Sequence, residues 1–295
     1  MSPHKIIDTH GPLLLPDGSL AQIGWSTQPM LDSNLENTRT TPLRFLQRLR
    51  LKRWDYYGLT TPEYFFSFTL ADIGYAGSVF AYAINSETGA CEEATLTLPF
   101  GRGVELPRNS TKGISRFKND QVEMVFEVKP SVRTLKVNWK AFGGAGKPDF
   151  CADVRFAAAP KHESMNLVIP IRGKRYYFNR KINCLPASGS VEYGGKAFAI
   201  SPDTCLGNLD WGRGVWEFNS YWVWASASGF LPGGRTLGLN MGYGFGESHA
   251  PSEHAVILDG KIVKFDRVDF TFDSQHYKNP WRMVSPDGRL DLTFT

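Results

Sequence analysis

The sequence predicts an all-β protein whose strands pair almost entirely in antiparallel fashion. Apolar and polar residues alternate with a period of two in many short runs, which is the pattern of a strand with one buried face. Asp-Gly pairs at 17–18, 259–260 and 287–288 lie between such runs, and this dipeptide favours tight hairpin turns. Aromatic residues, which suit a pleated and half-buried surface, make up 13% of the 295 residues.

The alternating runs follow one another along the chain, each bounded by turn-forming residues. The expected strands cover residues 48–52, 65–70, 78–84, 94–98, 122–128, 134–139, 166–171, 176–182, 191–200, 221–228 and 236–241. The loop at 85–89 and the Pro-Gly-Gly turn at 232–234 join their neighbours into hairpins. With shorter runs included, we expect roughly seventeen to twenty strands. A helical turn or two is expected only at 39–47.

Two loop-rich stretches, at 141–148 and 157–164, are the best places for a domain boundary. A chain with so many strands avoids open sheet edges by curling into barrels or sandwiches. The predicted organisation is an N-terminal lobe over residues 1–160 and a C-terminal lobe over residues 161–295. The sequence stops within an alternating stretch at 291–295, so we expect the second lobe to be cut short at its C-terminal end.

Composition and charge argue against several classes of protein. The 33 basic and 29 acidic residues give a net charge of +4, which is a weak field and does not imply a nucleic-acid partner. Cys91, Cys151, Cys184 and Cys205 are far apart and are expected to be reduced core thiols. The N-terminus has no apolar leader, and no window approaches the ~18 apolar residues of a membrane helix. We therefore expect a cytoplasmic protein without stable membrane insertion.

The densest group of functional side chains lies at residues 209–229. Half of the eight tryptophans fall within this segment, namely Trp211, Trp216, Trp222 and Trp224. In a strand at 221–228, alternation places Trp222, Trp224 and two serines on one face, as in a pocket wall with polar groups. The alternative to a pocket wall is a structural role, in which the tryptophans pack in the core between two sheets.

Asp210 and Arg213 lie three residues apart in a stretch interrupted by glycines, which we interpret as a loop feeding the next strand. At this spacing the two side chains could form a bidentate ion pair. Such a pair either belongs to a functional site or pins the loop structurally, and the two interpretations are about equally supported.

A second group follows at residues 239–254. Glycines at 242, 244 and 246 let another backbone or a ligand approach closely. Asn240 and Tyr243 lie in this stretch, and Glu253 and His254 open the next strand with their side chains on opposite faces. A solvent-exposed pair at a strand start is an equally good interpretation of these last two residues.

Asp55 and Asp72 each sit among aromatic residues near a strand end. A carboxyl in apolar surroundings has a raised pKa and can act as a general acid, but such an aspartate more often caps a turn or pairs with an arginine. No histidine pair has the spacing of a metal site, and no nucleophile elbow is present, so we expect no metal, no cofactor and no serine nucleophile.

Several motifs, taken in order, resemble an uncharacterised bacterial family with a domain of unknown function. They are Trp-Asp-Tyr-Tyr at 54–57, Ala-Asp-Ile-Gly-Tyr at 71–75, Leu-Asp-Trp-Gly-Arg-Gly-Val-Trp at 209–216, Trp-Val-Trp-Ala-Ser-Ala-Ser-Gly at 222–229, Gly-Tyr-Gly-Phe-Gly at 242–246 and Ser-Glu-His at 252–254. That family is similar, more distantly, to hydroxyneurosporene synthase (carotenoid 1,2-hydratase), AttH-like proteins and lipocalin-like Diels–Alderases. The resemblance implies two lipocalin-like antiparallel barrels packed side by side around an apolar cavity.

The resemblance further implies an enzyme that acts on a long apolar, isoprenoid- or polyketide-like substrate without a dissociable cofactor. Such an enzyme would protonate its substrate with a carboxylic acid or preorganise it for cyclisation or hydration. A carrier of a lipid-like ligand and a carbohydrate-binding or hydrolysing protein are the alternatives. For catalysis we expect Glu253 first and Asp210 second, with Arg213 orienting Asp210. The expected ligand-binding residues are Trp211, Arg213, Trp216, Trp222, Trp224, Asn240, Tyr243 and His254.

Overall fold

The computed structural model describes residues 5–244 and 251–295, and strands dominate it. The central feature is a 13-stranded sheet with the order β7-β6-β5-β4-β15-β13-β11-β10-β9-β8. β12 and β14 also pair with β13, and β2 pairs with β12. Every strand pair of this sheet is antiparallel, as the alternating pattern predicted.

The bounds of the sheet strands match most of the predicted runs. They are β2 Gly24–Ser26, β4 Lys52–Thr60, β5 Tyr64–Asp72, β6 Ala76–Asn85, β7 Cys91–Pro99, β8 Gly113–Lys118, β9 Val122–Lys129, β10 Val132–Trp139, β11 Phe150–Ala157, β12 Met165–Ile171, β13 Arg175–Tyr193, β14 Lys196–Ile200 and β15 Leu206–Val215. The expected strand 191–200 is in fact the β13–β14 hairpin, because Gly194 and Gly195 turn the chain there with positive φ.

The remaining strands form three smaller sheets. A four-stranded sheet has the order β16-β17-β18-β19, a three-stranded sheet the order β20-β21-β22, and β1 pairs with β3 in parallel. Their bounds are β1 Gly11–Pro12, β3 Leu31–Asp32, β16 Val223–Phe230, β17 Thr236–Tyr243, β18 Ala255–Leu258, β19 Lys261–Lys264, β20 Asp269–Thr271, β21 Trp281–Val284 and β22 Asp291–Phe294. The predicted turns at 232–234, 259–260 and 287–288 join neighbouring strands of these sheets.

Among the described residues, helical structure is limited to three short elements: η1 Leu35–Asn37, η2 Arg44–Leu46 and α1 Gln47–Arg50. The predicted strand at 48–52 is therefore wrong, and β4 begins only at Lys52. Leu49 is only partly buried, so this segment lacks the buried apolar face that would stabilise a strand. Leu46 and Leu49, spaced three residues apart, instead line one shallow hollow, as helical neighbours do.

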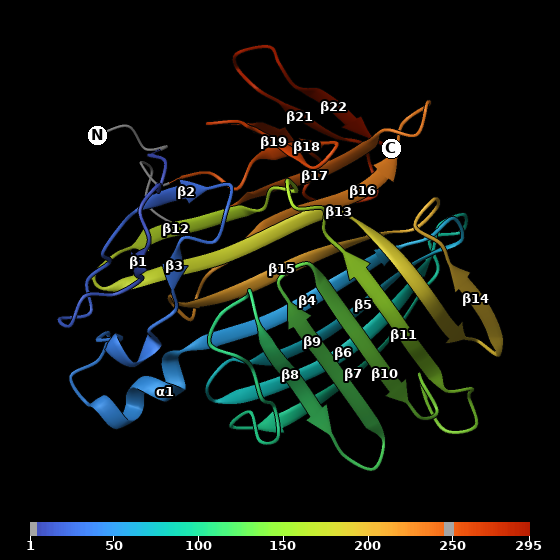
Figure 1. Ribbon diagram of the computed structural model, residues 1–295, viewed down its shortest axis with the longest axis horizontal. Helices are drawn as coiled ribbons and strands as arrows, with labels where there is room; N and C mark the ends of the chain where they lie inside the picture. The colour runs from blue at the N-terminus through green and yellow to red at the C-terminus, as the bar shows by residue number, and fades with distance from the viewer. Residues whose placement is uncertain (1–4, 245–250) are drawn as a thin grey trace.

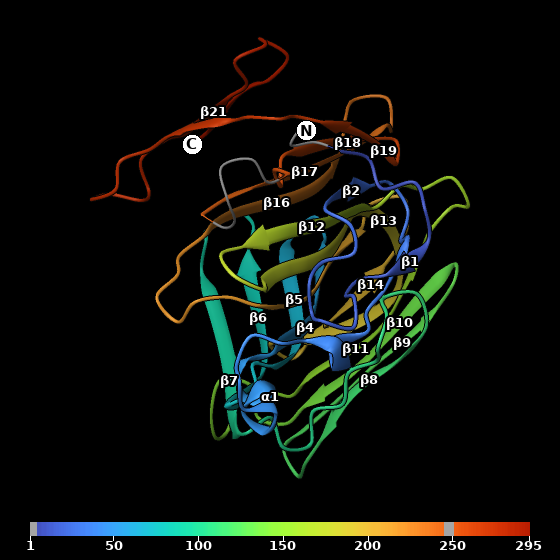
Figure 2. The same ribbon diagram turned by 90° about the vertical axis from the view of Figure 1, so that its left-hand side faces the viewer.

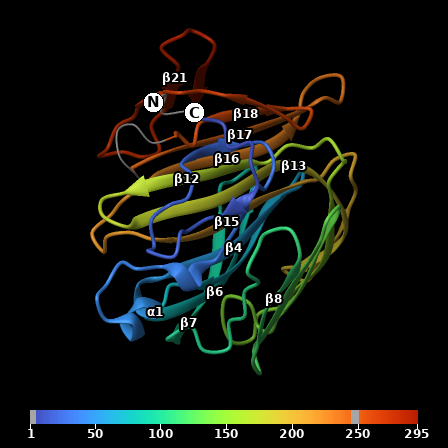
Figure 3. The ribbon, with the colours of Figure 1, turned by 60° about the vertical axis from the view of Figure 1, so that its left-hand side comes forward.

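The sheet curls around a large apolar core. β4–β7 form one wall and β8–β11 the other, and β13 and β15 lie between them (Figure 2). Fully buried aromatic residues from both walls meet inside, where Tyr57 of β4 stacks on Phe156 of β11 at 5.9 Å between ring centroids. The four-stranded sheet lies on the other face of β12 and β13 (Figure 3). Strands from both sides of residue 160 thus share one sheet, and the division into two lobes stays a prediction.

The 19-residue strand β13 connects these layers (Figure 1). Its first half pairs with β12 and β15, and its second half pairs with β11 and β14. A bulge between Ile182 and Leu185 shifts the register, and Cys184 there has a φ of 59°. The bulge also docks the outer sheet, because the Cys184 N–H donates to Ser228 Oγ at 2.9 Å and the Asn183 amide donates to the Ala227 and Leu239 carbonyls.

The structure bears on two expectations, one about membrane helices and one about the cysteines. In the described residues, no helix is long and apolar enough to cross a membrane. All four cysteines are free, but only Cys184 and Cys205 are buried. Cys91 is exposed because β7 is an edge strand with alternate residues facing solvent, so it is not a core thiol.

Candidate functional site

An aromatic cavity of about 410 Å³ lies between the outer face of the central sheet and the start of β16. Its volume falls in the ~300–1,000 Å³ range of small-molecule sites. Eight aromatic rings line it: Trp54, Tyr56, Phe80, Tyr82, Tyr177, Trp216, Trp222 and Trp224. Three ionisable side chains, Lys181, Asp210 and Glu253, lie among these rings. We call this space the aromatic cavity below.

Strand alternation explains why the rings converge. In β4, Trp54 and Tyr56 point into the aromatic cavity, whereas Tyr57 points into the core of the curled sheet. Edge-to-face contacts join the rings: Tyr56 meets Trp224 of the outer sheet at 5.5 Å, and Trp54 meets Trp216, which follows β15, at 5.7 Å between centroids. The aromatic walls are therefore contributed by both sheets.

Asp210 lies at the sheet wall of the cavity and accepts hydrogen bonds on both carboxylate oxygens. Oδ1 accepts from Asn179 Nδ2 at 2.6 Å and from Trp54 Nε1 at 3.2 Å. Oδ2 accepts from Lys181 Nζ at 2.6 Å, and the Lys181 side chain is only 3% exposed. Three donors from β4 and β13 thus converge on this carboxylate and fix its position in the wall.

Glu253 enters the same cavity from the segment before β18. Its burial raises the pKa of the carboxyl above the ordinary glutamate value, and nearby Asp210 raises it further, while Lys181 at 3.9 Å opposes both effects. Within the described residues Oε1 accepts no hydrogen bond. Burial also raises the pKa of the neighbouring Tyr177 hydroxyl well above its usual value, so this group remains a neutral donor beside Glu253.

Two residues of β17 make room for Glu253 and hold it in place. A Cβ at Gly242 would collide with Glu253 Oε2, so the glycine at this position creates the space that the carboxyl fills. Asn240 donates from Nδ2 to the Glu253 backbone carbonyl at 2.7 Å, and its Oδ1 accepts from Trp224 Nε1 at 2.8 Å. The amide of Asn240 thereby couples the carboxyl to one of the aromatic walls.

The predicted Asp210–Arg213 pair is wrong. Both residues lie in β15 rather than in a loop, and side chains three positions apart in a strand point to opposite faces. Arg213 faces the core, where its Nη2 lies 3.0 Å from Asp55 Oδ1 and its guanidinium stacks 4.2 Å from the Trp211 ring. Arg213 therefore does not orient Asp210, and Lys181 is the cation beside that carboxylate.

The other predicted site residues divide between the cavity and its surroundings. Trp216, Trp222 and Trp224 line it together with the two acids, and Asn240 lies behind them. Trp211 lies on the opposite face of β15, edge-on to Phe178 at 5.3 Å. Of the remaining residues, Tyr243 and His254 both contact Phe270 in the outer layer, at 4.9 Å and 5.7 Å.

Several predicted features serve structure or lie outside the described residues. The serines of β16 bind β13 rather than face the cavity, since Ser226 Oγ accepts from Asn183 Nδ2 at 2.9 Å. Asp55 and Asp72 pair with Arg213 and Arg53, as the structural alternative anticipated. Gly246 falls within 245–250, outside the described residues. Among the described residues, no cluster of three His, Cys, Asp or Glu side chains could hold a metal ion.

Sequence reasoning missed the polar side chains that β13 contributes. Asn179, Lys181 and Asn183 occupy every second position in the first half of β13, where most residues are buried. A lysine and two asparagines on one face of a buried strand are costly unless they have partners, and that regular placement was the signal available in the sequence. Trp54, Tyr56 and Tyr177 were likewise part of quoted motifs or predicted strands without being assigned to the site.

Comparisons with known proteins identify the family and several similar structures. The model of the family described as "Domain of unknown function (DUF2804)" matches residues 4–295. No curated protein sequence matches the chain. An AttH-like protein from Nitrosomonas europaea is similar in structure, with 14% identity, 83% of this chain and 80% of that chain covered, and a TM-score of 0.49.

Two further solved structures are similar at the same level. Kievitone hydratase from Nectria haematococca is 13% identical, with 80% of this chain and 72% of that chain covered and a TM-score of 0.45. CghA with Sch210972 is 13% identical, with the same coverage and a TM-score of 0.49. The sequence identities of 13–14% do not indicate what this chain binds or converts.

Proposed function

This chain belongs to the DUF2804 family, and from that premise and the aromatic cavity we propose that it is a proton-transfer enzyme for an apolar, unsaturated substrate. Glu253 is the proton donor, and the substrate is of isoprenoid or polyketide type. The single observation that supports the proposal best is a buried carboxyl with a raised pKa inside a cavity lined by aromatic rings.

The chemistry follows from the environment of Glu253. A carboxyl whose pKa is raised keeps its proton closer to neutral pH and acts as a general acid. Its proton adds to one carbon of a double bond and leaves a cation on the other. Water then adds to that cation and loses a proton, or a second double bond adds to it and the new cation loses a proton from a neighbouring carbon. In both cases the released proton returns to the Glu253 carboxylate. The net reaction is a hydration or a cyclisation, and it requires no electron transfer.

The rings supply what such a cation needs. Tryptophan and tyrosine faces attract cations with about 0.5–2 kcal/mol per contact, more where water is excluded. Lys181 would repel a cation if it were unpaired, but its ammonium is 2.6 Å from Asp210 Oδ2 and its charge is balanced there. The cavity thus combines a proton source with walls that stabilise positive charge.

The alternatives fit the site less well. A glycosidase uses two carboxyl groups in complementary roles, whereas both oxygens of Asp210 already accept hydrogen bonds from the protein. A lipid carrier needs the apolar walls but has no use for Glu253, since a buried carboxyl with a raised pKa lowers stability. The carrier function is therefore the outcome expected if Glu253 proves dispensable.

Deuterium incorporation tests the proposal. The protein is incubated in D₂O with a panel of unsaturated isoprenoids and polyenes, and products are measured by mass spectrometry. We expect incorporation with the wild type, a loss of at least a hundredfold in Glu253→Gln, and partial activity in Glu253→Asp. Equal incorporation in Glu253→Gln and the wild type would remove the acid mechanism.

Binding of the same compounds separates the enzyme from the carrier. A Trp222→Ala, Trp224→Ala double variant should bind the panel at least tenfold more weakly, measured by fluorescence titration. Glu253→Gln should retain binding. Binding without any incorporation by the wild type would favour the carrier, and unchanged binding in the double variant would mean that the ligand occupies another part of the protein.

A further inference from the structure

Two arginines, the buried Arg133 and the partly buried Arg180, lie on the core side of the central sheet, away from the aromatic cavity. Arg180 of β13 neighbours Lys181 in sequence and therefore points to the opposite face. Arg133 of β10 is 2% exposed. Both guanidinium groups donate to the same acceptor, the Ser110 carbonyl, each at 3.3 Å. The loop carrying Ser110 thus brings two cations together inside the fold.

In the part of the chain that the structure describes, this arginine pair is bound by neutral groups. Arg180 donates to Ser164 Oγ at 3.1 Å and to the Ser110 hydroxyl at 3.4 Å, all of them neutral acceptors. Within residues 5–244 and 251–295, neither arginine forms an ion pair with a carboxylate, and Arg133 Nε has no hydrogen-bond partner. Burial, reinforced by Arg133, lowers the pKa of Arg180 to about 9. Buried cations without an anion are costly, and a bound anion would offset that cost.

A second cavity gives access to Arg180. Its volume is about 480 Å³, and its polar lining includes Arg180, Ser110 and Asn166, together with His10, Asp32, Asn109 and Thr111. Phe178, Trp211 and Leu31 provide apolar walls beside them. The N-terminal segment, which includes β1 and β3, contributes Gly11, Leu31 and Asp32 to the lining of the same space. We call this space the arginine cavity, and it lies on the other side of β13 and β15 from Glu253.

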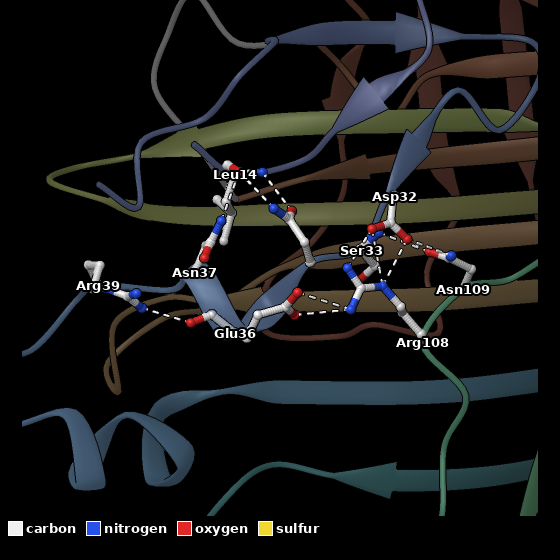
Figure 4. Close-up of polar contacts among 9 residues, drawn as sticks. Leu14, Asp32, Ser33, Glu36, Asn37, Arg39, Arg108 and Asn109 are labelled. Atoms are coloured by element: carbon white, nitrogen blue, oxygen red, sulfur yellow. Dashed lines mark hydrogen bonds and ion pairs between the residues drawn. The ribbon is translucent and has the colours of Figure 1, made fainter. Parts of the chain in front are cut away.

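A clamp holds the N-terminal segment over the arginine cavity. Arg108 donates to Asp32 and to Glu36, at 2.8 Å from Nε to Asp32 Oδ1 and 3.0 Å from Nη1 to Glu36 Oε1 (Figure 4). Asn109 Oδ1 accepts from the Ser33 N–H at 2.9 Å. Asp32 lines the cavity and is paired with Arg108, which also binds Glu36. These contacts tie the N-terminal segment to the loop that carries Ser110, while the Asp32 carboxylate stays at the rim.

We propose that the arginine cavity binds a small organic acid, with its carboxylate on Arg180 and its apolar body against Phe178 and Trp211. A guanidinium matches a carboxylate in shape and charge, and Arg133 behind it adds positive potential. The apolar walls select for a carbon chain rather than for a bare inorganic anion. The neighbouring carboxylate of Asp32 further disfavours a doubly charged head group. This site is independent of Glu253 and of the function proposed above.

Calorimetric titration of the full chain with octanoate, octanol and inorganic phosphate tests the proposal. We expect octanoate to bind at least tenfold more tightly than octanol, since only octanoate carries the charge. Phosphate should bind more weakly than octanoate. Equal affinity for octanol would show a purely apolar site, and phosphate binding as tight as octanoate would overturn the organic-acid assignment. A lack of octanoate binding would overturn it as well.

Variants locate the binding. Arg180→Gln should weaken octanoate at least tenfold, and Arg180→Lys should retain part of the affinity. Arg155→Gln, an exposed arginine on the outside of β11, should leave the affinity unchanged. Thr111→Glu adds a carboxylate to the cavity lining and should weaken binding even where Arg180→Gln fails to fold. Full octanoate affinity in folded Arg180→Gln or in Thr111→Glu would show that the site lies elsewhere.

Discussion

The two faces of β13 treat the charges of two adjacent residues, Arg180 and Lys181, in opposite ways. On the aromatic-cavity face, one cation lies between two acids, because Lys181 Nζ is 2.6 Å from Asp210 Oδ2 and 3.9 Å from Glu253 Oε1. On the core face, Arg180 lies beside Arg133 with neutral partners only among the described residues. Adjacent residues of one strand thus face different electrostatic environments. The comparison shows that a single sheet can separate an acid site from a cationic site.

Methionine substitutions at the adjacent residues 180 and 181 test this contrast most directly. Lys181→Met leaves Asp210 buried without its cation, and we expect unfolding to become easier by about 3–5 kcal/mol. Arg180→Met removes hydrogen bonds to neutral groups but also removes repulsion with Arg133, so we expect a loss below about 2 kcal/mol. Urea denaturation measures both values.

An exposed ion pair provides the control for this comparison. Lys136 lies 3.7 Å from Asp153, and both side chains are more than 60% exposed, so Lys136→Met should change stability by less than about 1 kcal/mol. Equal losses in Lys181→Met and Arg180→Met would mean that the two faces do not differ in the way described.

A substitution at Asn240 tests the hydrogen bonds on the aromatic-cavity face. Asn240→Leu leaves the Trp224 N–H and the Glu253 carbonyl without their partner, and we expect a loss of about 1–3 kcal/mol. Ligand binding should weaken in parallel, because the wall and the acid lose their common anchor. An Asn240→Asp variant keeps the acceptor for Trp224 and should retain more affinity. Unchanged stability in the leucine variant would contradict the coupling.

The pH dependence of stability gives the smallest effect. In the folded state the pKa of Glu253 is raised above its ordinary value of 4.5. The folded protein therefore holds a proton that the unfolded chain releases, and wild-type stability falls as pH rises from about 4.5 through the folded pKa. Glu253→Gln cannot ionise, so its stability relative to the wild type should increase with pH over this window.

Unfolding free energies of the wild type and Glu253→Gln between pH 4 and pH 8 provide the measurement. Glu123→Gln, which changes an exposed glutamate, is the matched control and should follow the wild-type curve. Parallel curves for the wild type and Glu253→Gln would show that the Glu253 carboxyl ionises equally easily in the folded and unfolded states.

The strands and hairpins could be predicted from the sequence because their signals are local. Alternation within β6 or β10 and the turn at 232–234 involve neighbouring residues only. The Lys181–Asp210 pair could not be predicted, because it depends on the register between β13 and β15, residues 29 apart in the chain. The Asp210–Arg213 prediction failed for a different reason. The glycines of β15 were interpreted as signs of a loop, although every residue of that strand is buried.

The position of β15 in the sheet also has a consequence for how the chain folds as it is made. β4, which is Lys52–Thr60, pairs with β5 on one side and with β15 on the other, and β15 is Leu206–Val215. Until residue 215 has left the ribosome, one edge of β4 exposes unpaired backbone groups beside Trp54 and Tyr56. Contacts this distant in sequence form slowly. We therefore expect the interval between synthesis of β4 and synthesis of β15 to be the stage most exposed to aggregation and to chaperone binding.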